Sequence, residues 1–138
     1  MMLFQVQGGT AKIEGNADSF AFILLFLAAC DGKLDDNEAT YIAMEVSNLI
    51  DAYDLEYEED TSFADCVRKA GKNWEACDGN LDDIHKIVLF CMDFLKSQFS
   101  MSEREDLVSK FRGIITHDGK VEEVEEQYFS VLEDHFLK

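Results

Sequence analysis

The chain has 138 residues, 47% of them hydrophobic, and a formal net charge of −17 at pH 7. This length and apolar content are enough for one domain with its own core, so a disordered acidic tail is excluded. The negative field around such a molecule repels nucleic acid and anionic membranes. We therefore expect neither as a partner, and favour cations or a basic protein surface.

The N-terminal residues 1–16 contain Gly8-Gly9 and Gly15 and show no helical period. We expect this segment to be either a short extended arm or a frayed tail. No segment alternates convincingly between polar and apolar residues, so no strand is predicted. The lack of proline also suits a mostly helical chain.

The first helix is expected from about Asp18 to Cys30, with Asn16 or Asp18 as its N-cap. Its apolar run ends in Leu-Ala-Ala-Cys, which is also typical of a bacterial lipoprotein cleavage site. We favour a buried helix for two reasons. Asp18, rather than a basic residue, precedes the run, and a similar run recurs before a later loop. The run is also too short to cross a bilayer.

Apolar residues spaced by three and four predict further amphipathic helices along the chain. One begins at Asp35, with Glu38 at its third position, and ends near Tyr53. A short helix follows from Ser62 to Gly71. The last three helices are expected to begin at Asp82, Ser102 and about Glu122. The final helix, which ends near Leu137, is expected to bury Val124, Tyr128, Val131 and Leu132.

These elements predict one all-α domain over residues 1–138, a compact bundle of about 6–7 helices. Its expected parts are an N-terminal arm (1–16), a first repeat (18–53), a middle section (54–101) and a second repeat (102–137). Each repeat is expected to be a helix–loop–helix unit, and the two units are expected to be related by a pseudo-twofold rotation.

The cysteines are expected to be free thiols. Cys30, Cys66, Cys77 and Cys91 form no CxxC pair and no spacing suited to zinc. At least three of them lie in apolar helical patterns, which favours burial. Free thiols are typical of a reducing compartment, so a cytoplasmic location is predicted.

An acidic loop occurs twice in nearly the same form. Residues 31–38 read Asp-Gly-Lys-Leu-Asp-Asp-Asn-Glu, and residues 118–125 read Asp-Gly-Lys-Val-Glu-Glu-Val-Glu. A fainter copy occupies residues 78–85. Each copy follows an apolar stretch and precedes a helical pattern, which predicts an internally duplicated helical protein.

The repeated carboxylates allow two interpretations. In the first, the glycines form turns and the acids cap helices, and no ligand is needed. In the second, the loops are similar to the latter half of a calcium-binding EF-hand loop. Neither copy has acids at the first two ligand positions, so water or the other loop must complete a metal shell. The candidate ligands for Ca²⁺, Mg²⁺ or Mn²⁺ are Asp31, Asp35, Glu38, Asp118, Glu122 and Glu125.

The repeated unit is an apolar helix, then Asp-Gly-x-[Leu/Val]-x-x-x-Glu, then a second amphipathic helix. In a small acidic chain it resembles the tellurite-resistance TerB family, over roughly residues 18–136. The resemblance implies a compact bundle with a pseudo-twofold relation between its halves and an acidic patch that binds divalent metal. It places Asp31 and Glu38 in the first acidic motif, and Asp118 and Glu125 in the second. The long middle section and its third loop depart from the family's pattern.

No phosphate-binding loop, Ser/His/Asp order or Cys/His nucleophile pattern is visible, so an enzyme is not expected. The sequence predicts a cytoplasmic, acidic, TerB-like domain of a stress response. This domain is expected to bind a divalent cation weakly, to present an acidic surface to a protein partner, or to do both. The alternative is an interaction or scaffold domain in which the loop acids only cap helices.

Overall fold

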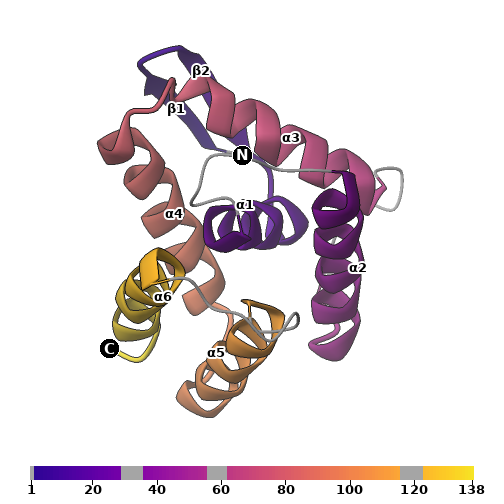
Figure 1. Ribbon diagram of the computed structural model, residues 1–138. Helices are drawn as coiled ribbons and strands as arrows, with labels where there is room; N and C mark the ends of the chain where they lie inside the picture. Colours follow the sequence, from indigo (N-terminus) through magenta and orange to yellow (C-terminus); the bar gives the residue numbers. More distant parts are fainter. Residues whose placement is uncertain (1, 29–35, 56–61, 116–122) are drawn as a thin grey trace.

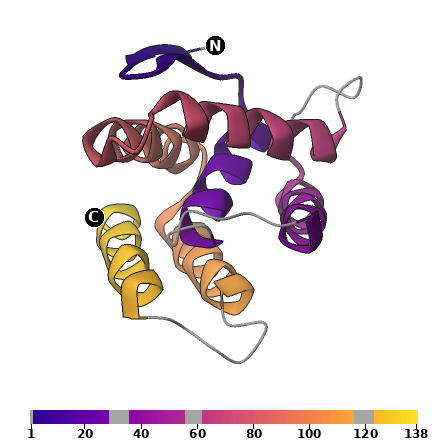
Figure 2. The ribbon, with the colours of Figure 1, turned by 45° about the horizontal axis from the view of Figure 1, so that its top comes forward.

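A nearly all-apolar helix lies at the centre of the fold. In the computed structural model of the chain, helix α1 (Asn16–Ala28) is surrounded by the other helices and packs against each of them (Figures 1 and 2). Every residue from Phe20 to Leu27 is 4% exposed or less. A helix that is apolar on all sides is stable in water only when other elements cover all sides. The predicted buried helix is therefore confirmed.

The structure describes residues 2–28, 36–55, 62–115 and 123–138. Six helices and one two-stranded sheet make up this described part of the chain, so the predicted helical bundle is confirmed. In chain order the elements are β1 (Met2–Val6), β2 (Gly9–Ile13), α1 (Asn16–Ala28), α2 (Asp36–Ala52), α3 (Phe63–Ala76), α4 (Leu81–Lys96), α5 (Met101–Ile115) and α6 (Glu123–Phe136).

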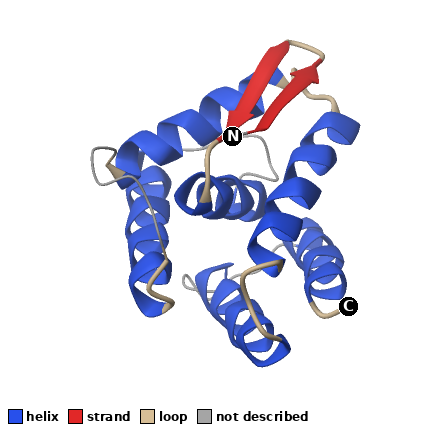
Figure 3. Ribbon diagram, turned by 180° about the vertical axis from the view of Figure 1, so that it is seen from behind, coloured by secondary structure: helices blue, strands red, loops and turns tan. Residues whose placement is uncertain are grey.

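The N-terminal segment is an antiparallel hairpin, which confirms the extended-arm alternative, whereas the prediction that no segment forms a strand is wrong here. Figure 3 shows the hairpin in red at the edge of the helical body, and β2 lies against α3. Phe4 and Ala11 point inward and are buried, whereas Leu3 and Lys12 are exposed. The polar–apolar alternation of β1 is weak because Leu3, an apolar residue, lies on the exposed face.

The turn between the strands depends on a glycine at position 8. The Gly8 N–H donates to the carbonyl oxygen of Ala76, 2.6 Å away. A Cβ at position 8 would lie 2.5 Å from that same oxygen. Only glycine allows the hairpin to approach the end of α3 this closely.

Three helix boundaries differ from the predicted ones. Helix α1 begins at Asn16, so Asn16 and Asp18 lie in its first turn rather than at its N-cap. Helix α3 continues through Gly71 to Ala76, because the left-handed backbone needed to end it occurs at Asp78 and Gly79 instead. Helix α5 is capped by Ser100 and Glu103 rather than by Ser102 and Glu105. The Glu103 N–H donates to Ser100 Oγ at 3.2 Å, and the Ser100 N–H donates to Glu103 Oε1 at 2.9 Å. The predicted cap at Ser62 is confirmed, since its Oγ accepts the Asp65 N–H at 3.1 Å.

Each predicted repeat contains two helices, α1 with α2 and α5 with α6. The buried stripe of α6 is Phe129, Leu132 and Phe136. Val131, which was predicted to be buried, is 62% exposed, because it lies to one side of this stripe.

Three cysteines, Cys66, Cys77 and Cys91, are free and buried, as predicted; Cys30 lies outside the described residues. Burial is the main cause that raises the pKa of the Cys66 and Cys77 thiols to about 11. Such thiols are protonated and unreactive at neutral pH. In the described part of the chain, no helix combines the length and apolar character needed to cross a membrane.

Candidate functional site

Most of the predicted metal ligands fall where the structure gives no description. Asp31, Asp35, Asp118 and Glu122 lie outside the described residues. Glu38 and Glu125 each occupy the third residue of their helices, α2 and α6, as the capping-box pattern predicts, but their side chains are not described. The relative positions of the six candidate side chains therefore lie outside what the structure describes.

The third, fainter loop copy is described, and in it the residues form a turn and a cap. Asp78 and Gly79 have positive φ angles of 50° and 75°. Asn80 then caps α4 by accepting the Asp83 N–H at 3.1 Å. The Asp83 carboxylate accepts the N–H of Gln7 at 2.9 Å. This copy follows the capping interpretation, with one acid used to hold the hairpin turn.

The described residues contain no group of three or more His, Cys, Asp or Glu side chains that could hold a metal ion. The ion pairs in this part of the chain instead join carboxylates to Lys, Arg or His side chains.

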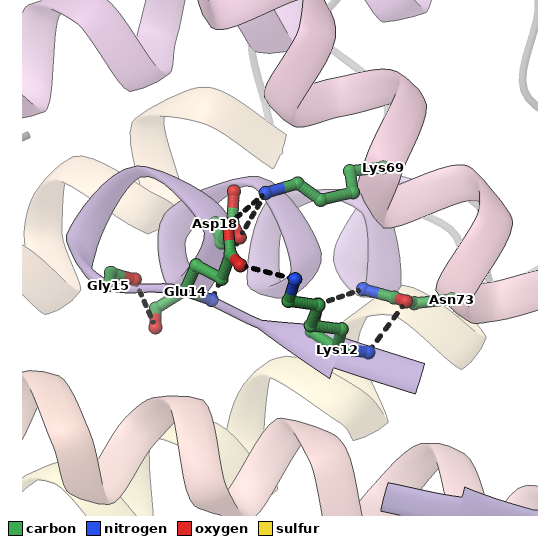
Figure 4. A network of polar contacts seen from close by, with 7 residues as sticks. Lys12, Glu14, Gly15, Asp18, Lys69 and Asn73 are labelled. Atoms are coloured by element: carbon green, nitrogen blue, oxygen red, sulfur yellow. Dashed lines mark hydrogen bonds and ion pairs between the residues drawn. The ribbon is translucent and has the colours of Figure 1, made fainter. Parts of the chain in front are cut away.

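The most buried of these charges lie where the hairpin meets α1 and α3 (Figure 4). The Asp18 side chain is 5% exposed, and its Oδ2 accepts from Lys69 Nζ at 2.9 Å and from the Glu14 N–H at 2.8 Å. Lys69 Nζ also donates to Glu14 Oε2 at 3.1 Å, and Lys12 Nζ lies 2.7 Å from Glu14 Oε1. We call Lys12, Glu14, Asp18 and Lys69 the ion-pair cluster. Opposite charges are matched within it, so its role is structural.

An amide side chain covers the outer edge of β2 beside this cluster. The Lys12 N–H donates to Asn73 Oδ1 at 3.0 Å, and Asn73 Nδ2 donates to the Lys12 carbonyl at 2.9 Å (Figure 4). Asn73 is buried, so these two bonds satisfy polar groups that lie away from water. The side chain occupies the place that a neighbouring strand would take.

The cluster predicts an acid-sensitive contribution to stability. Hydrogen bonds, first from Lys12 and then from Lys69, lower the pKa of Glu14 from 4.5 to about 2. A carboxyl group with a lowered pKa in the native state stabilises the fold above its unfolded pKa, and this contribution disappears as the pH falls towards the native pKa. Glu14→Gln should therefore be less stable than the wild type at pH 7, and the difference should shrink between pH 4.5 and about 2. Urea unfolding across that range measures it, and a constant difference would contradict it.

An apolar groove is lined by residues of α4, α6 and α1. Figure 1 shows these three helices next to one another, and each of them contacts the other two. The volume of the groove is about 250 Å³. Leu89 on α4 and Val131 on α6 are large apolar residues that remain 41% and 62% exposed. The residues that line the groove are Phe26, His85, Val88, Leu89, Met92, Gln127, Tyr128, Val131 and Leu132.

Three rings form one end of the groove. Phe26 lies 4.6 Å from Tyr128 between ring centroids and meets the His85 ring edge-on at 5.8 Å. His85 and Tyr128 also meet edge-on, at 6.1 Å. Of these rings, Phe26 is buried, whereas Tyr128 is half-buried and His85 is exposed, so the last two are available to a partner.

Charged contacts hold the α6 side of the groove in place. His135 Nε2 lies 2.6 Å from Asp93 Oδ1, which links α6 to α4. Arg112 of α5 makes two hydrogen bonds to the Glu126 carboxylate, at 3.0 and 3.2 Å, and stacks over the Phe129 ring. Helix α6 contains five acids and no lysine or arginine.

A second cavity, between α2 and α5, is larger but more mixed in character. Its volume is about 380 Å³, and Glu45 and Lys110 give it both signs of charge. Nearby, Tyr53 donates to Asp106 Oδ2 at 2.6 Å, and Lys110 lies over the Tyr53 ring. None of the large exposed apolar side chains of the described residues lines this cavity, so we favour the α4–α6 groove as the functional site.

Sequence reasoning missed the groove, although two signals point to it. Leu89 and Val131 are extra apolar residues on α4 and α6, and the structure places both outside the buried stripes of these helices. Comparison with models of protein families, with curated proteins and with solved structures finds no match to this chain.

Proposed function

We propose that this protein is an acidic interaction domain that binds the apolar face of a basic amphipathic helix in the α4–α6 groove. The observation that carries the proposal is the pair of exposed apolar residues, Leu89 and Val131, on opposite walls of the groove in a chain of net charge −17. Apolar side chains of the partner would fill the groove, and its basic residues would be attracted to the acidic surroundings.

The size of the groove supports a peptide rather than a small molecule. Sites for drug-sized ligands usually enclose roughly 300–1,000 Å³ and bury most of the ligand. At about 250 Å³ this groove is smaller, and it lies open between two helices. It suits a few anchoring side chains of a longer partner, which is how helix-in-groove recognition works.

The test is a titration with a Leu/Lys peptide designed as an amphipathic helix. Binding can be followed by the fluorescence of Trp74, the only tryptophan of the chain, whose ring lies 6.4 Å from that of Phe26 in the groove. We expect Val131→Lys to weaken binding at least about tenfold, a loss of about 1.4 kcal/mol, because it places a charge in the apolar site. Met44→Lys is the matched control, since Met44 on α2 is similarly exposed and does not line the groove.

A scrambled peptide of the same composition separates groove binding from general charge attraction. It keeps the charge but loses the apolar face, so it should bind much more weakly than the amphipathic peptide. Equal affinity for the two peptides, or equal losses in the two lysine variants, would mean that the groove is not the site.

A second proposed role is weak binding of a divalent cation by the duplicated loops, as the TerB resemblance implies. The observation that favours it is the recurrence of acids at equivalent places in residues 31–38 and 118–125. The incomplete ligand sets suggest a dissociation constant on the order of 10⁻⁴–10⁻³ M. On either role, the proposal is for a binding protein of a cytoplasmic stress response rather than for an enzyme.

The cation role predicts that millimolar Ca²⁺, Mg²⁺ or Mn²⁺ raises the melting temperature more than monovalent salt of the same ionic strength does. A double variant with Glu38→Gln and Glu125→Gln should lose this extra stabilisation but keep its fold, because glutamine can still serve in a capping box. Identical melting curves for the wild type and the double variant across the cation series would support loop acids that only cap helices.

A further inference from the structure

The outer edge of β1 has unpaired backbone hydrogen-bonding groups. Leu3 pairs with Lys12, and the Lys12 N–H and carbonyl point away from β1 to Asn73. In an antiparallel ladder the two residues of such a pair direct their groups to opposite sides, so those of Leu3 point outward from β1. The groups of Gln5, two residues along the strand, point the same way. Within the described residues, no hydrogen-bond partner meets these groups of Leu3 or Gln5.

The two edges of the hairpin therefore differ. Asn73 covers the β2 edge at Lys12 and thereby blocks the addition of a strand there. The β1 edge has no such cover, and β1 contains no proline and no charged residue that would discourage strand pairing. Met2 and Leu3 are 42% and 54% exposed, so apolar surface accompanies the open edge.

Charge indicates which partner this edge accepts. Residues 2–13 contain no Asp or Glu, whereas every helix of the described part of the chain contains at least one acid. A basic partner would be drawn to the acidic helices rather than to this acid-free hairpin. For a second copy, which is equally acidic, approach at the hairpin brings together two segments that have no carboxylates of their own, and at the turn the Asp83 carboxylate accepts the Gln7 N–H.

We propose that β1 is a self-association edge at which two copies pair antiparallel, so that their two hairpins form one four-stranded sheet. The outward groups of Leu3 and Gln5 in each copy would hydrogen-bond to those of the other, and the exposed Met2 and Leu3 side chains would be covered. Antiparallel pairing of identical edges is symmetric about a twofold axis, which closes the assembly at a dimer. The contact is a single short strand, so the dimer is weak and depends on protein concentration.

The self-association edge is tested by sedimentation equilibrium over a range of protein concentrations, at about 0.05 M and about 0.5 M NaCl. Dimerisation should be stronger at the higher salt concentration, because salt screens the repulsion between two chains of charge −17. Binding of a basic peptide in the groove should weaken with salt, so the two proposals give opposite salt responses. A protein that stays monomeric under all these conditions would contradict self-association.

Three variants locate the contact. Gln5→Pro removes an outward N–H and leaves the β1–β2 hydrogen bonds intact, and Leu3→Lys places a charge beside the open edge. Each should raise the dimer dissociation constant at least about tenfold, and Leu3→Lys remains the test if the proline variant does not fold. Thr10→Lys adds the same charge to the exposed face of β2 and should leave the dimer intact. Equal losses in Thr10→Lys and Leu3→Lys, or a dimer sensitive only to Val131→Lys, would overturn the proposal.

Discussion

Replacing Phe111 with alanine is expected to lower the free energy of unfolding by about 3–5 kcal/mol, the range typical of a fully buried phenylalanine. The Phe111 ring is fully buried in α5, and its centroid lies 6.3 Å from that of Phe20 in α1 and 6.1 Å from that of Phe136 in α6. Its removal leaves a cavity at the point where three helices meet. The expected loss is a large fraction of the stability of an ordinary domain.

Urea or thermal unfolding measures this loss, with Val131→Ala as the control. Val131 is also an apolar residue on a helix, but it is 62% exposed, so its truncation should change the stability by no more than about 0.5 kcal/mol. If the two alanine variants lost similar stability, the packing of α5 between α1 and α6 would be wrong. Unfolding of Phe111→Ala in two separate steps would show that α5 and α6 do not belong to one cooperative core.

Much of the helical architecture could be predicted from the sequence because its signals are local. The run from Phe20 to Leu27 is apolar at every position, which favours a helix that other elements cover on all sides. The cap of α3 is likewise local, because the two residues that form it, Ser62 and Asp65, are only three positions apart in the sequence. The α5 cap was misplaced because two overlapping Ser-x-x-Glu patterns, at Ser100 and Ser102, have the same local chemistry, so tertiary packing selects between them.

The features that distinguish this molecule depend instead on contacts between distant parts of the chain. Asn73 covers the edge of β2 across 61 residues, and Lys69 reaches Asp18 across 51. Neither pairing leaves a periodic pattern in the sequence. The groove exists because α4 and α6 lie side by side, and sequence periodicity does not predict how two helices are placed relative to each other. The duplicated acids, by contrast, repeat along the chain and are visible in the sequence alone.

Replacing Lys69 with methionine is expected to destabilise the protein by about 2 kcal/mol, because it leaves the Asp18 carboxylate buried without its cation. Removing one partner of a fully buried ion pair costs about 3–5 kcal/mol, and we expect less here because Lys69 is 31% exposed and water reaches its ammonium group. Methionine keeps most of the apolar stem of the lysine, so lost packing should contribute little.

A double-mutant cycle with Asp18→Asn identifies the buried charge as the cause. Asparagine has no charge to leave unpaired, and its side-chain oxygen can still accept the Glu14 N–H. The double variant should therefore lose less stability than the sum of the two single variants. Arg68→Met is the control, because Arg68 is one residue away and pairs with Asp65 on the exposed side of α3. Its loss should be about 0.2–1 kcal/mol. Equal losses for Lys69→Met and Arg68→Met, or additive losses in the cycle, would mean that Asp18 does not depend on Lys69.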